Sequence, residues 1–502
     1  EIRIPRNDRQ DDQGNRQPQR IIWTADAFCL YRGQWVPNGK HEPGAEWRTE
    51  QDLQAAEHVF ELSPADRPRV SLPLHGLWQM ARFDERGLVE ERTGPTPMPE
   101  LPLHWSSLPV PSVRNQQRPD LSFNHRYFLR TRVSVPADHE GRAFVLSFDE
   151  ISTFVTVYVN GKRMGHRTIP LAGWQVDVTE GIEPGKVNEI WVGIKDRYYA
   201  LTRAGDELRN VRYAFHRPER YLDENHGTTM AYDYPMKGHP HHGILDRVSL
   251  ISSGPAYVAD VFAKPSVRNG QLALEITLHN PTGRAMDVGV GNRVEPHGGG
   301  EAEKTFQTVR KTVPAGESLT WEVSEPWEDP RLWWRDDPFL YDVVTTVEAD
   351  GRTIDEKRTR FGFREWEIRG TAFYLNGVRQ QLRADLTFGG VSPDQKEEAV
   401  EFWRKSGQNM FRLRFQSTWG GLRQNRALDF FDEHGVVVRK TITTFDGQHA
   451  SYALAVQEER DGKSVRVANK ALFDNVRAQA RARTRDMRNH LSIFEWELDN
   501  EI

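Results

Sequence analysis

The chain has 502 residues, a net charge of −5 and a sequence pI near 6.4, so we expect three or four domains. This charge provides no bulk attraction to nucleic acid or to a membrane surface, and no run of 18 apolar residues is present that would span a bilayer. The single cysteine, Cys29, excludes an intrachain disulfide.

The cellular location follows only loosely from these features. One cysteine fits a cytosolic protein, and it equally fits a secreted protein large enough to be stable through its core. No signal peptide is visible, but position 1 is Glu rather than Met, so we expect that an N-terminal segment was removed or omitted. We predict a secreted or periplasmic protein, with the cytoplasm kept as the alternative.

The N-terminal segment is polar. Residues 1–20 are rich in Arg, Gln, Asp and Asn and hold almost no apolar residue after Ile4. This composition favours a flexible tail, or an arm that lies over another domain. We assign residues 1–65 to this arm.

Residues 66–262 have a β pattern. Apolar and polar residues alternate over 144–148 and over 155–159, and Asn160-Gly161 follows the second run directly. Asn-Gly between alternating runs predicts a tight hairpin, because both central residues of that turn need a positive φ. With no long helical pattern, we predict a sugar-binding-like β-sandwich of jelly-roll type.

Residues 263–361 form a second, smaller β segment. Leu272, Leu274, Ile276 and Leu278 alternate with polar residues, and a further alternating run precedes a turn at Asp350-Gly351. About 100 residues of short strands fit an immunoglobulin-like β-sandwich.

From residue 362 to 502 strands alternate with helices. This order predicts a parallel sheet or barrel, and four strands are half of a (β/α)₈ TIM barrel. The Ser-Pro-Asp-Gln run that starts at Ser392 is typical of a helix N-terminus. The predicted elements are strands at 380–383, 409–415, 436–439 and from Ser492 onward, with helices from Ser392 to Gly407, at 427–434 and at 469–489.

The last strand ends on Asn500-Glu501. A carboxylate beside an amide at the carboxyl-terminal tip of a strand suits a general acid that acts on a sugar. The amide can hydrogen-bond a ring hydroxyl while the carboxyl group protonates the leaving oxygen. We therefore predict Glu501 and Asn500 as catalytic residues.

Other polar residues lie at or just past predicted strand ends, which is where a (β/α)₈ barrel has its active site. Arg383, Asp385, Arg412 and Gln416 could bind hydroxyl groups or a carboxylate of a sugar. A structural interpretation of Arg383 and Arg412 is equally open, in which both lie inside the barrel and pair with carboxylates.

Two tryptophans are candidates for stacking on sugar rings. Trp419 lies in a loop next to Gly420-Gly421, and Trp496 lies in the last strand. An indole suits stacking because it combines a large apolar face with one polar group. For both residues a place in the core is the alternative.

A metal site is not expected. The stretch His239-Pro-His241-His242 contains clustered imidazoles, but neighbouring histidines on a turn rarely bind one ion, and no Cys, Asp or Glu lies nearby at ligand spacing. No phosphate-binding glycine loop follows a strand, and no nucleophile elbow is present. We predict no cofactor.

Taken in order, the motifs resemble glycoside hydrolase family 2, which includes β-galactosidases, β-glucuronidases and β-mannosidases. The family has a sugar-binding jelly roll, an immunoglobulin-like sandwich and a (β/α)₈ barrel. The matching stretches are His125-Arg-Tyr127, Val157-Tyr-Val-Asn160-Gly161, Asp177-Val-Thr179, Leu332-Trp333, Pro338-Phe-Leu-Tyr341, Arg360-Phe-Gly-Phe363-Arg364, Phe373-Tyr-Leu-Asn-Gly377, Leu382-Arg383, Asn409-Met-Phe-Arg412, Arg488-Asn-His490-Leu-Ser-Ile493 and Asn500-Glu501.

The resemblance implies an exo-acting retaining β-glycosidase that hydrolyses terminal β-linked sugars of oligo- or polysaccharides by double displacement. Glu501 would be the acid/base and Asn500 would hold the sugar 2-hydroxyl, with a second carboxyl group about 5 Å from Glu501. The family nucleophile would lie beyond residue 502. Half a barrel would also leave a sheet edge open. We therefore expect a C-terminal polypeptide, as a separate chain or as the rest of a longer product, to complete the barrel.

Three positions depart from the family pattern. Asp385-Leu-Thr-Phe388 stands where a His is common, Leu413-Arg414-Phe415 where Thr-Ser-His is common, and Arg439-Lys440 where an acidic residue often ends the third strand. The additional arginines lead to the hypothesis of an acidic or sulfated sugar substrate.

A non-catalytic carbohydrate-binding or scaffold protein with a degenerate half-barrel is the competing hypothesis. The intact Asn500-Glu501 pair favours the enzyme, and the missing nucleophile favours the scaffold. The oligomeric state is open, with a homodimer as one candidate because large sandwich-plus-barrel enzymes often dimerise.

Overall fold

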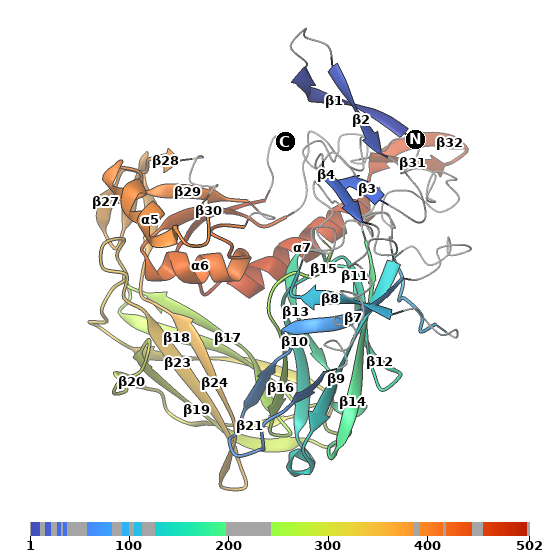
Figure 1. Ribbon diagram of the computed structural model, residues 1–502. Helices are drawn as coiled ribbons and strands as arrows, with labels where there is room; N and C mark the ends of the chain where they lie inside the picture. The colour runs from blue at the N-terminus through green and yellow to red at the C-terminus, as the bar shows by residue number, and fades with distance from the viewer. Residues whose placement is uncertain are drawn as a thin grey trace.

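The computed structural model describes residues 2–10, 16–21, 28–31, 34–37, 58–82, 93–99, 105–112, 126–196, 242–385, 391–414, 418–443 and 455–498. Two β-sandwiches stand side by side, and a parallel β/α layer lies across both (Figure 1). The described part of the chain contains no helix that is long and apolar enough to cross a membrane. Two antiparallel hairpins occupy the segment assigned to the arm, formed by β1 (Ile2–Gln10) with β2 (Arg16–Ile21) and by β3 (Phe28–Tyr31) with β4 (Gln34–Pro37).

The first sandwich packs a seven-stranded sheet against a five-stranded sheet. In spatial order the larger sheet contains β12 (Lys162–Arg167), β11 (Phe154–Val159), β14 (Lys186–Lys195), β9 (Arg126–Val135), β7 (Gly76–Arg82) and β8 (Trp105–Val110), with β5 (Val59–Glu61) also paired to β9. The smaller sheet contains β13 (Ala172–Asp177), β10 (Ala143–Ser152), β16 (Val248–Ser253) and β6 (Val70–Pro73), with β15 (Gly243–Ile244) also paired to β10. Two short 3-10 helices lie in its loops, η3 (Ala137–His139) and η4 (Thr179–Gly181).

The predicted Asn-Gly hairpin is present between β11 and β12. Asn160 has a φ of 50° and Gly161 a φ of 81°, as this turn requires. The alternating side chains Val155, Val157 and Val159 all enter the core between the two sheets. The β prediction for this segment is therefore confirmed at the level of strands.

The first sandwich begins earlier than we predicted from sequence. Strand β5 (Val59–Glu61) runs parallel to β9, and Leu62 is buried in the same core. The segment before residue 66 thus contributes to the sandwich and is not wholly an arm.

The second sandwich has a three-stranded and a five-stranded sheet. The predicted core residues Leu272, Leu274, Ile276 and Leu278 are all buried between them. The turn at Asp350-Gly351 has positive φ at both residues, 50° and 72°. The strands are β17 (Tyr257–Ser266), β18 (Gln271–His279) and β22 (Ser318–Pro326) in one sheet, and β20 (Lys304–Thr305), β19 (Met286–Pro296), β23 (Tyr341–Ala349) and β24 (Arg352–Phe361) with β21 (Val309–Val313) in the other.

The third region opens with a small antiparallel sheet, and here the predicted first strand at 380–383 is wrong. Strand β27 of this small sheet ends at Gln380, and the first parallel strand, β28, begins only at Ala384. Short strands joined by tight turns can be shifted by several residues without changing the sequence pattern. The small sheet consists of β25 (Trp366–Arg369), β26 (Ala372–Leu375) and β27 (Val378–Gln380).

Four parallel strands follow in the order β28-β29-β30-β33, alternating with helices as predicted. Their closure into an eight-stranded barrel remains a prediction. The elements are β28 (Ala384–Asp385), α5 (Lys396–Lys405), β29 (Met410–Leu413), α6 (Gln424–Glu433), β30 (Val437–Thr441), the hairpin β31 (Ala455–Arg460) and β32 (Lys463–Ala468), α7 (Lys470–Met487) and β33 (Ile493–Glu497).

Helix α5 begins later than the Ser392 signal indicated. The amide of Gln395 donates to the carbonyl of Ser392, so this stretch forms a separate turn ahead of the helix. Helix α7 begins as predicted, because the side chain of Asn469 accepts a hydrogen bond from the amide of Leu472.

The two faces of the parallel sheet differ. Phe411, Leu413 and Val438 point toward the helices and form a core with α5 and α6. Residues on the opposite side, which we call the helix-free face, are apolar near the strand beginnings and charged further along. The apolar part packs on β25 and β26, where Phe494 contacts the rings of Trp366 and Phe373.

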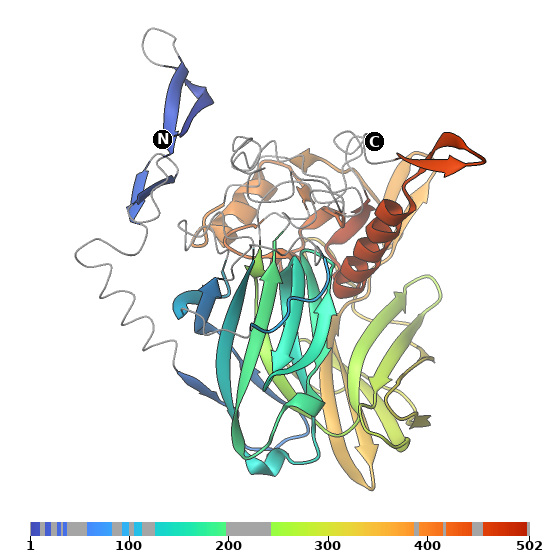
Figure 2. The ribbon, with the colours of Figure 1, turned by 90° about the vertical axis from the view of Figure 1, so that its right-hand side faces the viewer.

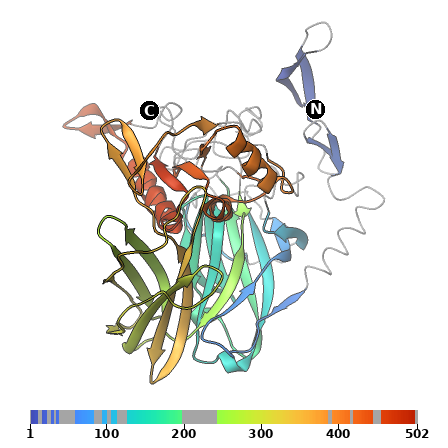
Figure 3. The ribbon, with the colours of Figure 1, turned by 90° about the vertical axis from the view of Figure 1, so that its left-hand side faces the viewer.

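Ion pairs and hydrogen bonds attach this layer to both sandwiches. Helix α7 lies along the top of the seam between them (Figures 2 and 3). Asp486 accepts a hydrogen bond from the amide of Gly173 in the first sandwich, and Arg488 pairs with Asp260 in the second. The parallel strands are therefore held at a fixed place above the two β domains.

Candidate functional site

The carboxyl ends of the parallel strands form the edge at which we expect a site. Strand β30 ends at Thr441 beside Glu497, the last residue of β33. Asn500 and Glu501 follow β33 within four residues in the sequence, but they lie outside the described residues, as does Gln416. For Asp385 the structure describes the backbone, which pairs with Phe411, and not the side chain.

Arg412 lies on the helix-free face and takes part in a buried ion pair. Its Nε donates to Glu497 Oε2 at 2.9 Å and its Nη2 to Oε1 at 2.7 Å. The carboxylate of Glu497 is only 3% exposed. Of the two interpretations of Arg412, the structure therefore supports an arginine that pairs with a carboxylate on this face.

Two further groups complete the shell of Glu497. Arg439 Nη2 donates to Oε1 at 2.5 Å, and Thr441 Oγ1 donates to Oε2 at 2.5 Å. Arg439 also lies 3.5 Å from the carboxylate of Glu495. We call Arg412, Arg439, Thr441, Glu495 and Glu497 the strand-end cluster; it joins β29, β30 and β33.

The charge state of Glu497 follows from these contacts. Burial disfavours its ionised form, but the hydrogen bonds from Thr441 and Arg412 outweigh burial and hold the pKa below its usual value. The cluster has two guanidinium groups and two carboxylates, so their charges balance. Arg412 and Arg439 are thus already paired with carboxylates of the protein. They therefore give little support to the hypothesis that the substrate is an acidic sugar.

Arg383 does not lie where the sequence predicted. Its carbonyl accepts hydrogen bonds from the amides of Asn409 and Met410, and its Nε donates to the carbonyl of Gly407 at 2.5 Å. Gly407 and Asn409 precede β29, which Met410 begins, so Arg383 lies at the amino-terminal edge of the sheet. The prediction failed because the first parallel strand begins one residue after Arg383.

Trp419 is also placed differently from the predicted stacking platform. It is 1% exposed, and its ring packs on Phe430 and Phe431 of α6 at centroid distances of 5.2 and 4.9 Å. A buried indole has no free face for a sugar ring, so the core alternative is correct. Trp496, by contrast, is 36% exposed and remains a candidate contact residue.

Behind the cluster, on the helix side, lies a buried cation that sequence reasoning missed. Lys440 is fully buried, and its Nζ donates to the carbonyl of Thr441 at 2.9 Å. Burial, together with the nearby charge of Arg483, lowers the pKa of Lys440 far below its usual value. The sequence marked Lys440 only as a departure from the family pattern, and its burial was not expected because Lys is ordinarily an exposed residue.

The same buried region connects the site to the first sandwich. Arg423, just before α6, binds Glu150 of β10 through both Nε, at 3.0 Å, and Nη2. The two side chains are 8% and 3% exposed. Glu150 also attracts Arg483, and burial lowers the pKa of this arginine to about 10. Buried charged side chains thus connect β10 of the first sandwich to the carboxyl ends of the parallel strands.

Glu497 is the main functional-site residue that the sequence analysis missed. A signal was present, because acidic residues alternate at positions 495 and 497 while Arg412 and Arg439 lie at matching places on neighbouring strands. Within the described ranges, no three His, Cys, Asp or Glu side chains group together as metal ligands would. Of the histidine stretch, only His242 is described, and it is buried 3.7 Å from Asp196.

Comparison with known proteins gives two family models. One, described as glycosyl hydrolases family 2, matches residues 256–364, and the other, described as a glycosyl hydrolase 2 galactose-binding domain-like region, matches residues 103–234.

Relatives and solved structures agree with this. A β-glucuronidase of Formosa agariphila is 21% identical over 79% of this chain and 39% of its own length. The β-mannosidase B of Thermothelomyces thermophilus is 22% identical over 86% of this chain and 50% of its own length. The crystal structure of a β-galacturonidase from Eisenbergiella tayi bound to galacturonate has a TM-score of 0.61 at 16% identity, covering 86% of this chain and 65% of that one. The chain thus spans half or less of the length of these two curated relatives, and the likeness to the solved structure shows a shared fold.

Proposed function

Because the chain belongs to glycoside hydrolase family 2, we propose that it is the part of a retaining β-glycosidase that carries the acid/base residue, Glu501. The observation that carries this proposal is the strand-end cluster. It holds the carboxyl ends of β29, β30 and β33 together at one edge, and Asn500-Glu501 follow the last of these strands directly. In (β/α)₈ enzymes catalytic groups come from this edge.

The proposed reaction has two steps. A carboxylate nucleophile attacks the anomeric carbon while the Glu501 carboxyl group gives its proton to the glycosidic oxygen, which leaves as an alcohol. In the second step Glu501, now a carboxylate, takes a proton from water as the water oxygen displaces the nucleophile from the anomeric carbon. Asn500 binds the 2-hydroxyl of the sugar in both steps.

We propose that the nucleophile comes from polypeptide outside these 502 residues, and that the same polypeptide completes the barrel. This part of the proposal is supported by the share of the relatives that the chain covers, 39% and 50%. We further propose a secreted or periplasmic enzyme that acts on the terminal sugar of β-linked oligo- or polysaccharides.

For the substrate we propose a terminal β-linked hexopyranose. The relatives carry the names of β-glucuronidases, a β-galactosidase and β-mannosidases, which share the β-linked pyranose and differ in the groups on the ring. The exposed indole of Trp496, on the strand that leads to Glu501, offers a face for that ring.

The test uses natively purified protein, with every polypeptide that accompanies the chain, and a panel of aryl β-glycosides. We expect hydrolysis in which the first product, followed by proton NMR, is the β-anomer. Glu501→Gln should lower kcat/KM by about 10²–10⁴-fold for the glycosides whose leaving groups are weakly acidic and need a proton. Glu401→Gln, the same change at an exposed carboxylate of α5, serves as the control and should leave the rate unchanged. Sugar binding without any turnover, equal in wild type and Glu501→Gln, would instead support the scaffold hypothesis.

A further inference from the structure

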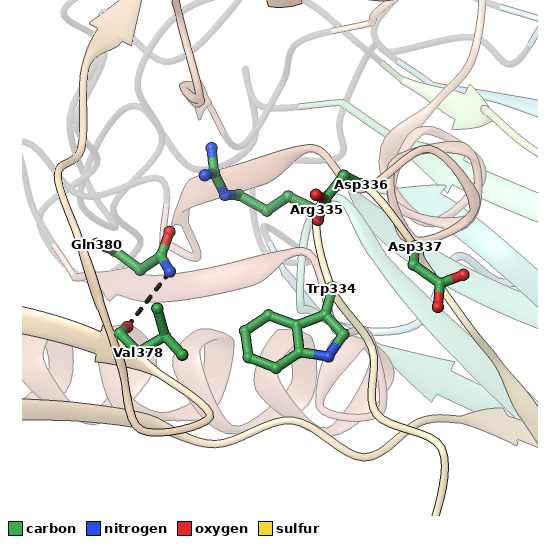
Figure 4. Close-up of a pocket in the computed structure, with 6 residues that line it drawn as sticks. All are labelled: Trp334, Arg335, Asp336, Asp337, Val378 and Gln380. Atoms are coloured by element: carbon green, nitrogen blue, oxygen red, sulfur yellow. Dashed lines mark hydrogen bonds between the residues drawn. The ribbon is translucent and has the colours of Figure 1, made fainter.

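A cavity of about 450 Å³ lies at the opposite edge of the parallel sheet from the strand-end cluster. It is lined by the loop from Trp334 to Asp337 and by Val378 and Gln380 of β27 (Figure 4). Its volume falls in the roughly 300–1,000 Å³ range of small-molecule sites. Arg383, which lies beside it, precedes β28, so the cavity faces the amino-terminal edge of the sheet.

One part of the cavity wall is apolar. Trp334 is half-buried, and its six-membered ring points toward Val378, whose side chain is 53% exposed (Figure 4). An indole next to an aliphatic side chain suits the C–H face of a pyranose ring, which is apolar while the ring edge carries hydroxyl groups. The Gln380 amide, which donates to the Val378 carbonyl at 3.3 Å, adds a polar group at the rim.

The other part of the wall is cationic. Arg335 extends over the cavity toward Gln380, whereas the Asp337 carboxylate turns away and binds Arg331 (Figure 4). Among the described residues, the guanidinium groups of Arg335, Arg383 and Arg404 have no carboxylate within ion-pair distance, and the latter two donate to backbone carbonyls.

Positive charges outnumber negative charges around Arg335. Burial, together with the neighbouring charges of Arg383 and Arg404, lowers its pKa, while Asp336 partly opposes this effect. A cation in such surroundings gains from an anionic ligand, which would restore the charge balance.

We propose that this cavity is a second, non-catalytic saccharide site that binds a sugar unit bearing an anionic group, either a uronate carboxylate or a sulfate ester. The pyranose ring lies against Trp334 and Val378, and the anionic group binds Arg335. Such a site would retain a charged polysaccharide on the protein at a distance from the proposed active site.

The experiment measures binding of three monosaccharides by isothermal titration calorimetry to natively purified protein that carries Glu501→Gln, so that turnover is blocked. The probes are methyl β-glucuronide, methyl β-glucoside 6-sulfate and the neutral methyl β-glucoside. We expect at least one anionic probe to bind at least tenfold more tightly than the neutral one. The preferred anionic probe distinguishes a carboxylate site from a sulfate site.

Two variants assign the binding to the cavity. Arg335→Gln removes the positive charge but keeps a polar side chain, and it should weaken the anionic probe about tenfold or more without changing the melting temperature. Trp334→Ala should weaken all probes that bind there, and its folding is checked separately because the indole also packs on the core around Trp333. Arg477→Gln, at an exposed arginine of α7 outside the cavity lining, is the control and should bind as the parent does.

Three results would overturn the proposal. The first is equal affinity for neutral and anionic probes. The second is the absence of measurable binding by any probe. The third is binding of an anionic probe that is unchanged in Arg335→Gln, which would place the sugar elsewhere. None of these outcomes depends on catalysis, so the proposed glycosidase activity stands or fails separately.

Discussion

Arg412 on β29 reaches past the intervening strand β30 to bind Glu497 on β33 through two nitrogens, at 2.9 and 2.7 Å. A bidentate pair between strands that are not neighbours fixes their relative position along the sheet. Since Glu497 lies four residues before Glu501, this pair also fixes where the proposed acid/base segment leaves the sheet.

The first prediction concerns Glu497→Gln. The amide keeps the size of the side chain but removes the charge that balances Arg412 and Arg439, and its nitrogen cannot accept their hydrogen bonds. Removing one partner of a buried ion pair costs about 3–5 kcal/mol. We therefore expect the free energy of unfolding, measured by urea denaturation, to fall by an amount in that range.

Glu401→Gln serves as the control for this change. Glu401 pairs with Lys405 on the surface of α5, and such exposed pairs contribute about 0.2–1 kcal/mol. If both variants lost equally little stability, the strand-end cluster would not hold the strands together.

The second prediction concerns the buried pair between Arg423 and Glu150. Each single change, Arg423→Gln or Glu150→Gln, leaves one charge without its main partner and should destabilise the protein by about 3–5 kcal/mol. The double variant should be more stable than the sum of the two losses predicts, with a coupling of roughly 0.5–3 kcal/mol. Additive losses in a double-mutant cycle of urea denaturation would show that the two side chains do not interact.

Much of the fold could be predicted because its signals are local. Asn160-Gly161 and Asp350-Gly351 are turns that need positive φ, and Asn469 caps α7 as its position suggested. Alternation of apolar residues identified the strands of both sandwiches, since one face of each strand must be buried. These features depend on residues close together in the sequence.

The features that the sequence did not reveal depend on contacts between distant segments. Trp419 lies beside two glycines, which suggested an exposed loop, yet α6 covers its ring. Arg383 fell at the wrong edge because the first parallel strand begins at Ala384, directly after Arg383, whereas the predicted strand 380–383 ended on it. Glu497 obtains its role only from Arg412 and Arg439 on other strands. Asn500 and Glu501, the residues that best indicated function, lie outside the described residues and remain predictions.

The third prediction concerns the different effects of replacing Trp419, which is buried, and Trp496, which is partly exposed. Trp419→Ala removes a buried side chain and should lower the free energy of unfolding by about 3–5 kcal/mol. Trp496→Ala should change it by less than about 1 kcal/mol, because its side chain is partly in water. Trp496→Ala should instead raise KM for aryl β-glycosides with little change in kcat. An unchanged KM would remove Trp496 from the proposed substrate site.

The fourth prediction concerns pH. Burial raises the pKa of Asp486 to about 7, against about 3.9 in an unfolded chain. Between these values the folded protein keeps the proton that the unfolded chain releases, so stability from this group is greatest below pH 4 and falls as the pH rises to 7.

The Asp486→Asn variant isolates this effect. Each pKa unit corresponds to about 1.4 kcal/mol, and since Asp486 keeps some contact with water we expect a difference on the order of 1–3 kcal/mol. Urea denaturation from pH 5 to 8 should show a steeper loss of stability in the wild type than in the variant. Parallel curves would mean that Asp486 titrates normally at the contact with Gly173.

The most direct test of the central claim, that Glu501 donates the proton to the leaving group, compares kcat/KM for β-glycosides whose leaving groups differ in acidity. A leaving group that is already a stable anion needs no proton. Glu501→Gln should therefore hydrolyse a dinitrophenyl glycoside at close to the wild-type rate of bond cleavage and lose about 10²–10⁴-fold on an alkyl glycoside of the same sugar. An equal loss on both substrates would contradict the assignment of Glu501 as the general acid.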